Sequence, residues 1–149
     1  MTAPAMTSAR HEWIRPYPLG EKIALAGEIV AMFVRVRLLL WTSDLPSVLA
    51  ELRAGADGQP AYDDRLAEKA AAIRLGRAIG RIMRFVPGDS RCLTRSLVLA
   101  GLLARRGVKT TLVIGVVPGP DFRAHAWVES EKLALLPPLD DVYERLVEV

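Results

Sequence analysis

Two side chains of this 149-residue chain, Cys92 and His125, have the types and spacing that nucleophilic chemistry needs. Cys92 follows Ser90, which can cap the first turn of a helix, so the thiol is expected at a helix start. There the helix dipole favours an anion, which lowers the pKa of the thiol and favours the nucleophilic thiolate. A neighbouring backbone N–H can point at a developing oxyanion. The other interpretation of Cys92 is an inert, buried cysteine.

His125 lies within Phe122–Glu129, a segment with the composition of a strand. Alternation along such a strand places His125 with Trp127 on the face opposite an aliphatic one. An imidazole beside the Cys92 thiol would serve as a general base, whereas a half-buried histidine without a catalytic role is the other interpretation. The first interpretation requires the thiol and the imidazole to meet where a helix packs on a sheet.

A cysteine–histidine pair of this kind commonly uses a carboxylate to fix the tautomer of the imidazole. Asp140 and Asp141 are candidates because they follow a turn that returns the chain alongside the histidine strand. Glu129 is a third option, since it follows His125 on the same strand face. The residues alone leave the choice among these carboxylates open.

The elements that must position these residues are helices followed by strands. Apolar spacing and capping signals predict four helices, over residues 21–41, 45–53, 63–85 and 91–106. Composition predicts strands over residues 110–117 and 122–129, with a short third strand at 133–136. The loop at 54–60 predicts a division into an N-terminal helical region, residues 1–57, and a core, residues 58–149. The expected fold is α+β, with the cysteine helix packed on a small antiparallel sheet.

Composition restricts the kinds of site and partner. The chain is 51% hydrophobic, which is enough to form a core. Its net charge of +3 is too small to indicate a nucleic-acid-binding protein. A single cysteine excludes an internal disulfide and a cysteine-based metal cluster, and with two histidines a structural zinc site is not expected. We expect no metal and no cofactor.

The cysteine count, the N-terminal residues and the charges within the apolar stretch favour a cytoplasmic protein without a membrane span. One cysteine gives no sign of an oxidising compartment, and residues 1–20 contain Pro, His, Glu and Arg where a secretory signal would be apolar. Charges at Glu28, Arg35 and Arg37 interrupt the apolar stretch 23–41, and each would cost about 2.5 to 3.5 kcal/mol at a bilayer centre. We expect this stretch to be a helix, either part of the core or a docking surface for a partner.

Four arginines recur at helical spacing within the third predicted helix: Arg74, Arg77, Arg81 and Arg84. Such a row can bind a peptide or a nucleic acid, or it can be the solvated face of the helix. The solvated face is the simpler interpretation.

One further pattern combines four segments: CLTRSL at 92–97, LLARRGV at 102–108, LVIGV at 112–116 and FRAHAWVE at 122–129. Together they are similar to the transglutaminase-like leader peptidases of lasso-peptide biosynthesis. The resemblance implies a transglutaminase/papain-like core and a cysteine protease that removes the leader from a ribosomally made precursor peptide. It also implies that Cys92 is the nucleophile and His125 the general base.

The resemblance further implies partners. The chain is similar to the stand-alone proteases of this family, which lack a fused leader-recognition domain and depend on a small, separate leader-binding protein. A cyclase of the asparagine-synthetase type would then close the ring, and it is a further candidate partner. Neither a nucleic acid nor a membrane is expected as a partner.

The third catalytic residue is where the chain departs from this family, whose aspartate position is occupied here by Pro137. Asp140 is the expected replacement, giving a Cys92–His125–Asp140 triad, while Asp141, or a dyad without a carboxylate, stays open. Two other functions also stay open. One is an acyl or amide transferase that uses the same dyad, and the other is a non-catalytic peptide-binding helper.

Overall fold

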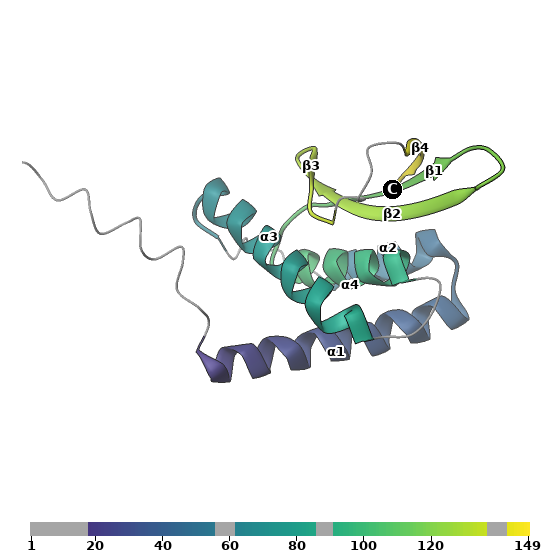
Figure 1. Ribbon diagram of the computed structural model, residues 1–149. Coiled ribbons are helices and arrows are strands. Elements are labelled where there is room, and N and C mark those ends of the chain that lie inside the picture. Colours follow the sequence, from purple (N-terminus) through teal and green to yellow (C-terminus); the bar gives the residue numbers. More distant parts are fainter. Residues whose placement is uncertain (1–17, 56–61, 86–90, 137–142) are drawn as a thin grey trace, which may run out of the picture.

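The structure is a computed structural model that describes residues 18–55, 62–85, 91–136 and 143–149. Within these ranges the helices precede the strands, as expected (Figure 1). The helices are α1 (Leu19–Thr42), α2 (Leu45–Ala54), α3 (Arg65–Ile82), which continues into a 3₁₀ turn (Met83–Phe85), and α4 (Arg91–Arg105). The strands are β1 (Thr111–Val117), β2 (Arg123–Ser130), β3 (Leu133–Ala134) and β4 (Glu144–Glu148). The predicted α+β fold is therefore confirmed.

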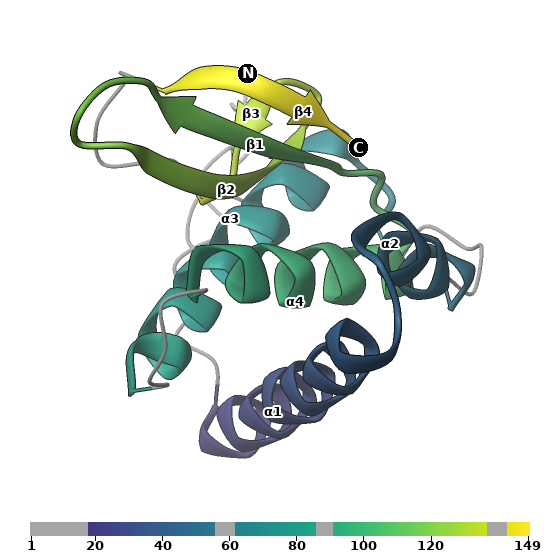
Figure 2. The ribbon, with the colours of Figure 1, turned by 90° about the vertical axis from the view of Figure 1, so that its right-hand side faces the viewer.

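The helices cover one face of the sheet, and α4 is the central element. Both ribbon views show α4 between the sheet and α1 (Figures 1 and 2), and α4 contacts α1, α2, α3, β1 and β2. A helix surrounded in this way must be apolar on several sides. Five of its apolar side chains are accordingly 0% exposed: Leu97, Val98, Leu99, Leu102 and Leu103.

Local signals in the sequence explain where the helices begin and end. The Asp44 side chain accepts a hydrogen bond from the Ser47 N–H at the start of α2, and Asp64 accepts one from the Leu66 N–H at the start of α3. After α4, Gly107 adopts a left-handed φ of 73°, which glycine adopts without a steric penalty. The chain can therefore turn directly from α4 towards β1.

The sheet has the strand order β3-β2-β1-β4, with antiparallel pairing throughout the described strands. β1 and β2 form its centre, where Gly115 pairs with His125 and Ile114 with Ala126. The sequence analysis missed β4, because every residue of this edge strand is exposed and two of its five residues are glutamates. Charged residues are common on edge strands, where they discourage further pairing.

The first two helices share one hydrophobic core with α4. Ile29, Met32 and Leu52 are buried in it, and a Cβ at Gly101 would lie 2.9 Å from the Met32 sulfur. Glycine thus permits the close approach of α1 to α4. The predicted boundary between residues 57 and 58 lies outside the described residues, so that division stays a prediction. Among the helices of the described ranges, none has the length and apolar character needed to cross a membrane.

Candidate active site

Cys92 is the second residue of α4, in the first turn, as the sequence analysis expected. Its side chain is half-buried. A sulfur at this position lies at the positive end of the helix dipole, which favours its anionic form. The predicted cap, Ser90, lies outside the described residues.

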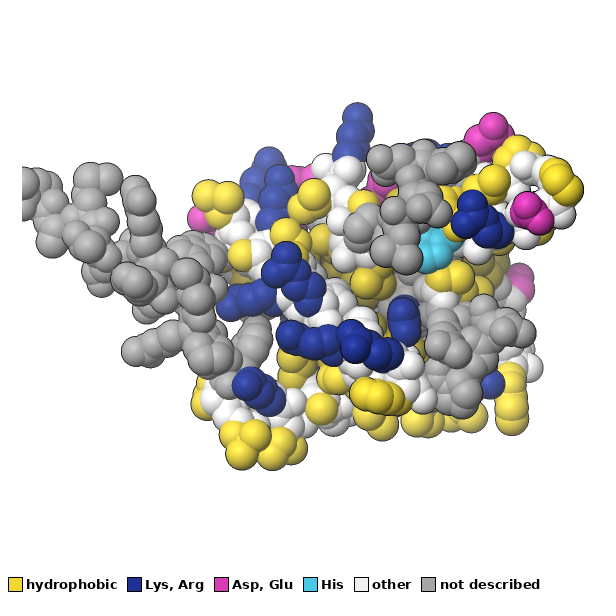
Figure 3. Space-filling view, viewed as in Figure 1, with side chains coloured by type: hydrophobic (Ala, Val, Ile, Leu, Met, Phe, Trp, Pro, Cys, Tyr) yellow, Lys and Arg dark blue, Asp and Glu magenta, His cyan; other side chains and the backbone are white. Residues whose placement is uncertain are grey.

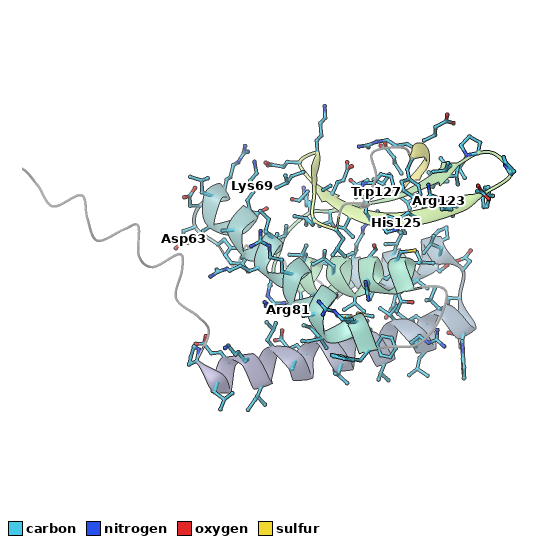
Figure 4. The ribbon with its side chains drawn as sticks, in the orientation of Figure 1. Asp63, Lys69, Arg81, Arg123, His125 and Trp127 are labelled. Atoms are coloured by element: carbon cyan, nitrogen blue, oxygen red, sulfur yellow. The ribbon has the colours of Figure 1, made fainter. Side chains whose placement is uncertain are left out.

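His125 lies near the start of β2, and its imidazole is within hydrogen-bonding reach of the Cys92 sulfur. This hydrogen bond is the main reason that the pKa of the Cys92 thiol lies below its ordinary value. Burial of the sulfur works in the opposite direction, while a hydrogen bond from the Ala126 backbone N–H lowers the pKa further. Figure 4 shows His125 on β2, above the end of α4 where this helix begins. The structure thus brings together the two residues that the sequence singled out.

The edge of β2 is held to α4 through Ala126, the residue after His125. The Ser96 hydroxyl donates a hydrogen bond of 3.0 Å to the Ala126 carbonyl, and the Ala126 N–H donates to the Cys92 sulfur. Cys92 and Ser96 are one helical turn apart, so one face of α4 takes the place of a neighbouring strand here. Among the described strands, β3 pairs with β2 only at Glu129 and Ser130, which leaves this part of the edge to α4.

Ser96 is therefore a positioning residue that the sequence analysis did not identify. It is 0% exposed, and a buried hydroxyl must find a partner. The signal that could have revealed it is the spacing of four between a cysteine and a serine within an otherwise apolar helix face. This spacing puts both polar atoms on the same side of the helix.

Two aromatic rings surround the imidazole. The Trp127 ring stacks near it with centroids 6.2 Å apart and an interplanar angle of 19°, and the Tyr143 ring lies at 5.6 Å, tilted by 42°. A Cβ at Gly115 would lie 2.8 Å from the Trp127 ring, so glycine on β1 makes room for the indole. The rings restrict the positions that the His125 side chain can adopt. Tyr143 was not identified from the sequence.

Glu129 shares the strand face of His125, as alternation predicted, but it has other partners. It accepts a hydrogen bond of 2.9 Å from the Trp127 indole N–H and one of 2.6 Å from the Arg145 guanidinium. These contacts hold the indole in place rather than the imidazole. Glu129 therefore supports the aromatic wall of the site.

The other two carboxylate candidates, Asp140 and Asp141, lie outside the described residues. In the chain they precede Tyr143, whose ring contacts His125, by three and two residues. The assignment of Asp140 as the third member of a triad stays a prediction.

Cys92 and His125 open onto a pocket of about 690 Å³ between α3, α4, β2 and residues 133–136, called here the β3 segment. Its remaining described lining consists of Ile73, Gly76, Arg77, Gly80, Arg95, Ala126, Ala134, Leu135 and Leu136. A Cβ at Gly76 would lie 2.9 Å from the Leu135 carbonyl oxygen, so glycine lets the β3 segment pack directly on α3. Figure 3 shows His125 (cyan) reaching the surface beside a band of arginine and lysine side chains.

The described residues of the site supply a thiol and an imidazole. Among the described residues, no group of three His, Cys, Asp or Glu side chains is placed to hold a metal ion. The expectation of a protein without a metal or cofactor stays a prediction.

Comparison with known proteins identifies the family. Residues 30–145, more than half of the chain, match the family model described as "Transglutaminase-like superfamily", a group that contains cysteine peptidases and transferases. No curated protein and no solved structure matches the chain significantly. The matched region includes all four described helices in whole or in part and both residues of the Cys92–His125 pair. The chain belongs to the transglutaminase-like superfamily.

Proposed function

We propose that this protein is a cysteine peptidase that removes the leader from a lasso-peptide precursor before a cyclase closes the ring. The observation that carries the peptidase part is the hydrogen-bonding reach between Cys92 and His125 in an open pocket, with the pKa of the thiol lowered. A lowered pKa increases the thiolate fraction at neutral pH, and the thiolate is the attacking species. The superfamily of the chain supports the same chemistry.

In the proposed mechanism, the Cys92 thiolate attacks the carbonyl carbon of the peptide bond between leader and core. Backbone N–H groups at the start of α4 stabilise the oxyanion that forms. His125 gives its proton to the leaving amine of the core peptide, so the C–N bond breaks and a thioester with the leader remains. His125 then takes a proton from water, whose oxygen attacks the thioester and releases the leader with a new carboxylate.

Asp140 is proposed as the residue that orients His125, and Ser96 positions both catalytic groups by holding β2 to α4. The lasso-peptide part of the proposal rests on the resemblance carried by segments 92–97 and 122–129. By that resemblance, a separate leader-binding protein delivers the precursor, and the cyclase acts on the product. These partners are proposals about the pathway in which such a peptidase works.

The direct test is to incubate the purified chain with a candidate precursor, with and without the leader-binding protein, and to weigh the products. The wild-type chain should release a leader that carries the mass of one added water, and Cys92→Ala should release none. Cleavage by Cys92→Ala would refute the assignment. A product in which the leader is joined to an added amine instead of water would identify a transferase.

The labelling rate of Cys92 separates a peptidase from a non-catalytic helper. Iodoacetamide should label the native protein at neutral pH faster than it labels the same protein in denaturant, because only the native thiol is hydrogen-bonded to His125. Slower labelling of the native protein would favour a helper whose cysteine is structural.

A further inference from the structure

The described residues that line the pocket beside Cys92 give it a positive charge. Two of its described lining residues, Arg77 on α3 and Arg95 on α4, carry a guanidinium, and none is an aspartate or glutamate. Cys92 and His125 add no net charge, whether as thiol and imidazole or as thiolate and imidazolium. The described wall therefore carries two positive charges, which exceed the single negative charge that the proposed Asp140 would add.

Arg95 places a second positive charge beside the thiol. It follows Cys92 by three residues, so its side chain starts on the same side of α4. One of its terminal nitrogens donates to the Met83 carbonyl at 3.1 Å, which ties α4 to the end of α3. Its Nε is buried and has no hydrogen-bond partner among the described residues. This Nε is enclosed by protein atoms, so Arg95 contributes its positive charge to the pocket rather than this N–H.

Arg77 is exposed at the edge of the same pocket and makes no ion pair with a described carboxylate. The start of α3 is different, because Lys69 and Arg65 share Glu131 there at 3.2 and 3.8 Å. The Glu131 carboxylate is thus paired at the start of α3 rather than with Arg77. In Figure 3, dark blue side chains form a band that leads across this face towards His125.

The pocket surface near Arg77 also leaves room for a ligand. Gly80 lies one turn from Gly76 along α3, and a Cβ at Gly80 would meet no atom within 4 Å. Gly80 thus leaves part of the pocket wall without a side chain, and much of the remaining described lining is apolar. A peptide chain can therefore pass over Gly80 without meeting a side chain from that position.

From these observations we infer that the pocket binds a substrate carboxylate close to the scissile bond, through the exposed guanidinium of Arg77 and the positive charge of Arg95. Guanidinium groups pair with carboxylates in a fixed two-point geometry, which suits selection of one acidic group. The carboxylate can belong to an Asp or Glu side chain or to a free peptide C-terminus. The identity of the substrate in this inference rests on the proposed function. The charge of the site rests on its lining residues and is independent of that function.

The charge of the site can be measured with two small reagents that alkylate Cys92. Iodoacetate is an anion and iodoacetamide is neutral, and in both reactions the thiolate forms an S–C bond while iodide leaves. The ratio of their rate constants on one protein cancels the thiolate fraction and reports the local field. At low ionic strength, Arg77→Gln should lower the iodoacetate-to-iodoacetamide ratio by about three- to fivefold, and salt should reduce the difference.

Two variants control this measurement. Arg77→Lys keeps the charge and should retain most of the ratio, while Arg37→Gln removes an exposed charge from α1, which contributes no residue to the pocket, and should change nothing. An unchanged ratio in Arg77→Gln would overturn the inference. An equal fall in Arg37→Gln would do the same, because the effect would then reflect net charge alone.

Peptides then separate the two sources of the carboxylate and the two proposals. With Cys92→Ala, fluorescein-labelled peptides spanning the precursor cleavage site are compared as Glu and Gln versions and as free acid and amide at the C-terminus. Tighter binding of the Glu version identifies a side chain, tighter binding of the free acid identifies a terminus, and equal binding of all four overturns the inference. Cleavage of precursor by the wild type without any charge preference would leave the peptidase assignment standing and remove this inference. Charge-selective binding without cleavage would leave this inference standing and remove the peptidase assignment.

Discussion

The junction between α4 and β2 and the outer face of α1 differ in how their side chains are placed. At the junction, polar atoms are buried and paired, and the Ser96 hydroxyl, 0% exposed, bonds the Ala126 carbonyl. On α1, large apolar side chains are exposed along one stripe: Leu19, Ile23, Val30, Val34, Leu38 and Trp41. Figure 3 shows hydrophobic side chains along the lower edge of the molecule, where α1 lies. The comparison shows that a few buried hydrogen bonds fix the site, whereas α1 is held by its other face.

That inner face of α1 is fully buried. Ile29, Met32 and Val36 are at most 2% exposed and belong to the same core as α4. Two ion pairs add to the contact, Arg106 with Glu28 at 2.6 Å and Arg35 with Glu51 at 3.2 Å. These pairs are partly exposed, so each contributes little compared with the apolar contacts. The apolar character of α1 thus comes from two faces with different surroundings.

Neighbouring residues on α1 give the sharpest test of this difference. Ile29→Ala should lower the free energy of unfolding by about 2 to 5 kcal/mol, because Ile29 is 0% exposed and its removal leaves a cavity in the core. Val30→Ala should change it by less than about 0.5 kcal/mol, because Val30 is 53% exposed. Urea unfolding followed by circular dichroism measures both. Equal effects would mean that the outer face is covered in solution.

A buried serine at the junction tests the second half of the comparison. Ser96→Ala leaves the buried Ala126 carbonyl without its 3.0 Å partner and should cost about 1 to 3 kcal/mol of stability. It should also raise the apparent pKa of Cys92 alkylation, because β2 is then less firmly held beside α4. Ser130→Ala is the matched control, since Ser130 is also buried and bonds the Lys109 carbonyl away from the site. A shift in the alkylation profile of Ser130→Ala as large as that of Ser96→Ala would contradict a positioning role for Ser96.

The sequence predicted the elements that carry strong local signals. The four helices and the two central strands have apolar spacing, caps or β-branched runs, and each was placed within a few residues of its observed bounds. The pairing of Cys92 with His125 followed from a helix start and a strand face, which are also local features. β4 has charged, exposed residues and no local signal that distinguishes it from a loop.

Contacts between distant residues were the part that the sequence could not supply. The bond from Ser96 to Ala126 spans 30 residues, and it depends on how α4 lies along β2. The partners of Glu129 likewise depend on Arg145, which reaches it only because β4 pairs with β1. Alternation placed Glu129 on the correct face but could not show that Trp127 and Arg145 would occupy it.

The imidazole has a predicted effect on the thiol that can be read from a pH profile. The His125 hydrogen bond is the largest cause of the lowered pKa of Cys92, so His125→Ala should move that pKa upward. The rise of iodoacetamide labelling with pH should then occur at a higher pH, with a loss of about tenfold at pH 7 for each unit of the shift. Tyr143→Phe, which keeps a ring beside His125, should leave the profile in place. An unchanged profile in His125→Ala would show that the imidazole does not activate this thiol.

The two glycines of α3 that line the pocket should respond differently to the same substitution. Gly80→Ala adds a methyl group in open space and should stabilise the helix by about 0.5 to 1 kcal/mol. Gly76→Ala gains the same helix propensity, but its Cβ would lie 2.9 Å from the Leu135 carbonyl oxygen, a backbone atom, so the β3 segment must shift. We expect Gly76→Ala to be less stable than Gly80→Ala in urea unfolding and to change the rate of Cys92 labelling, because the moved segment forms a wall of the pocket. Equal stabilisation by both substitutions would show that the β3 segment is not packed against α3 as closely as this structure places it.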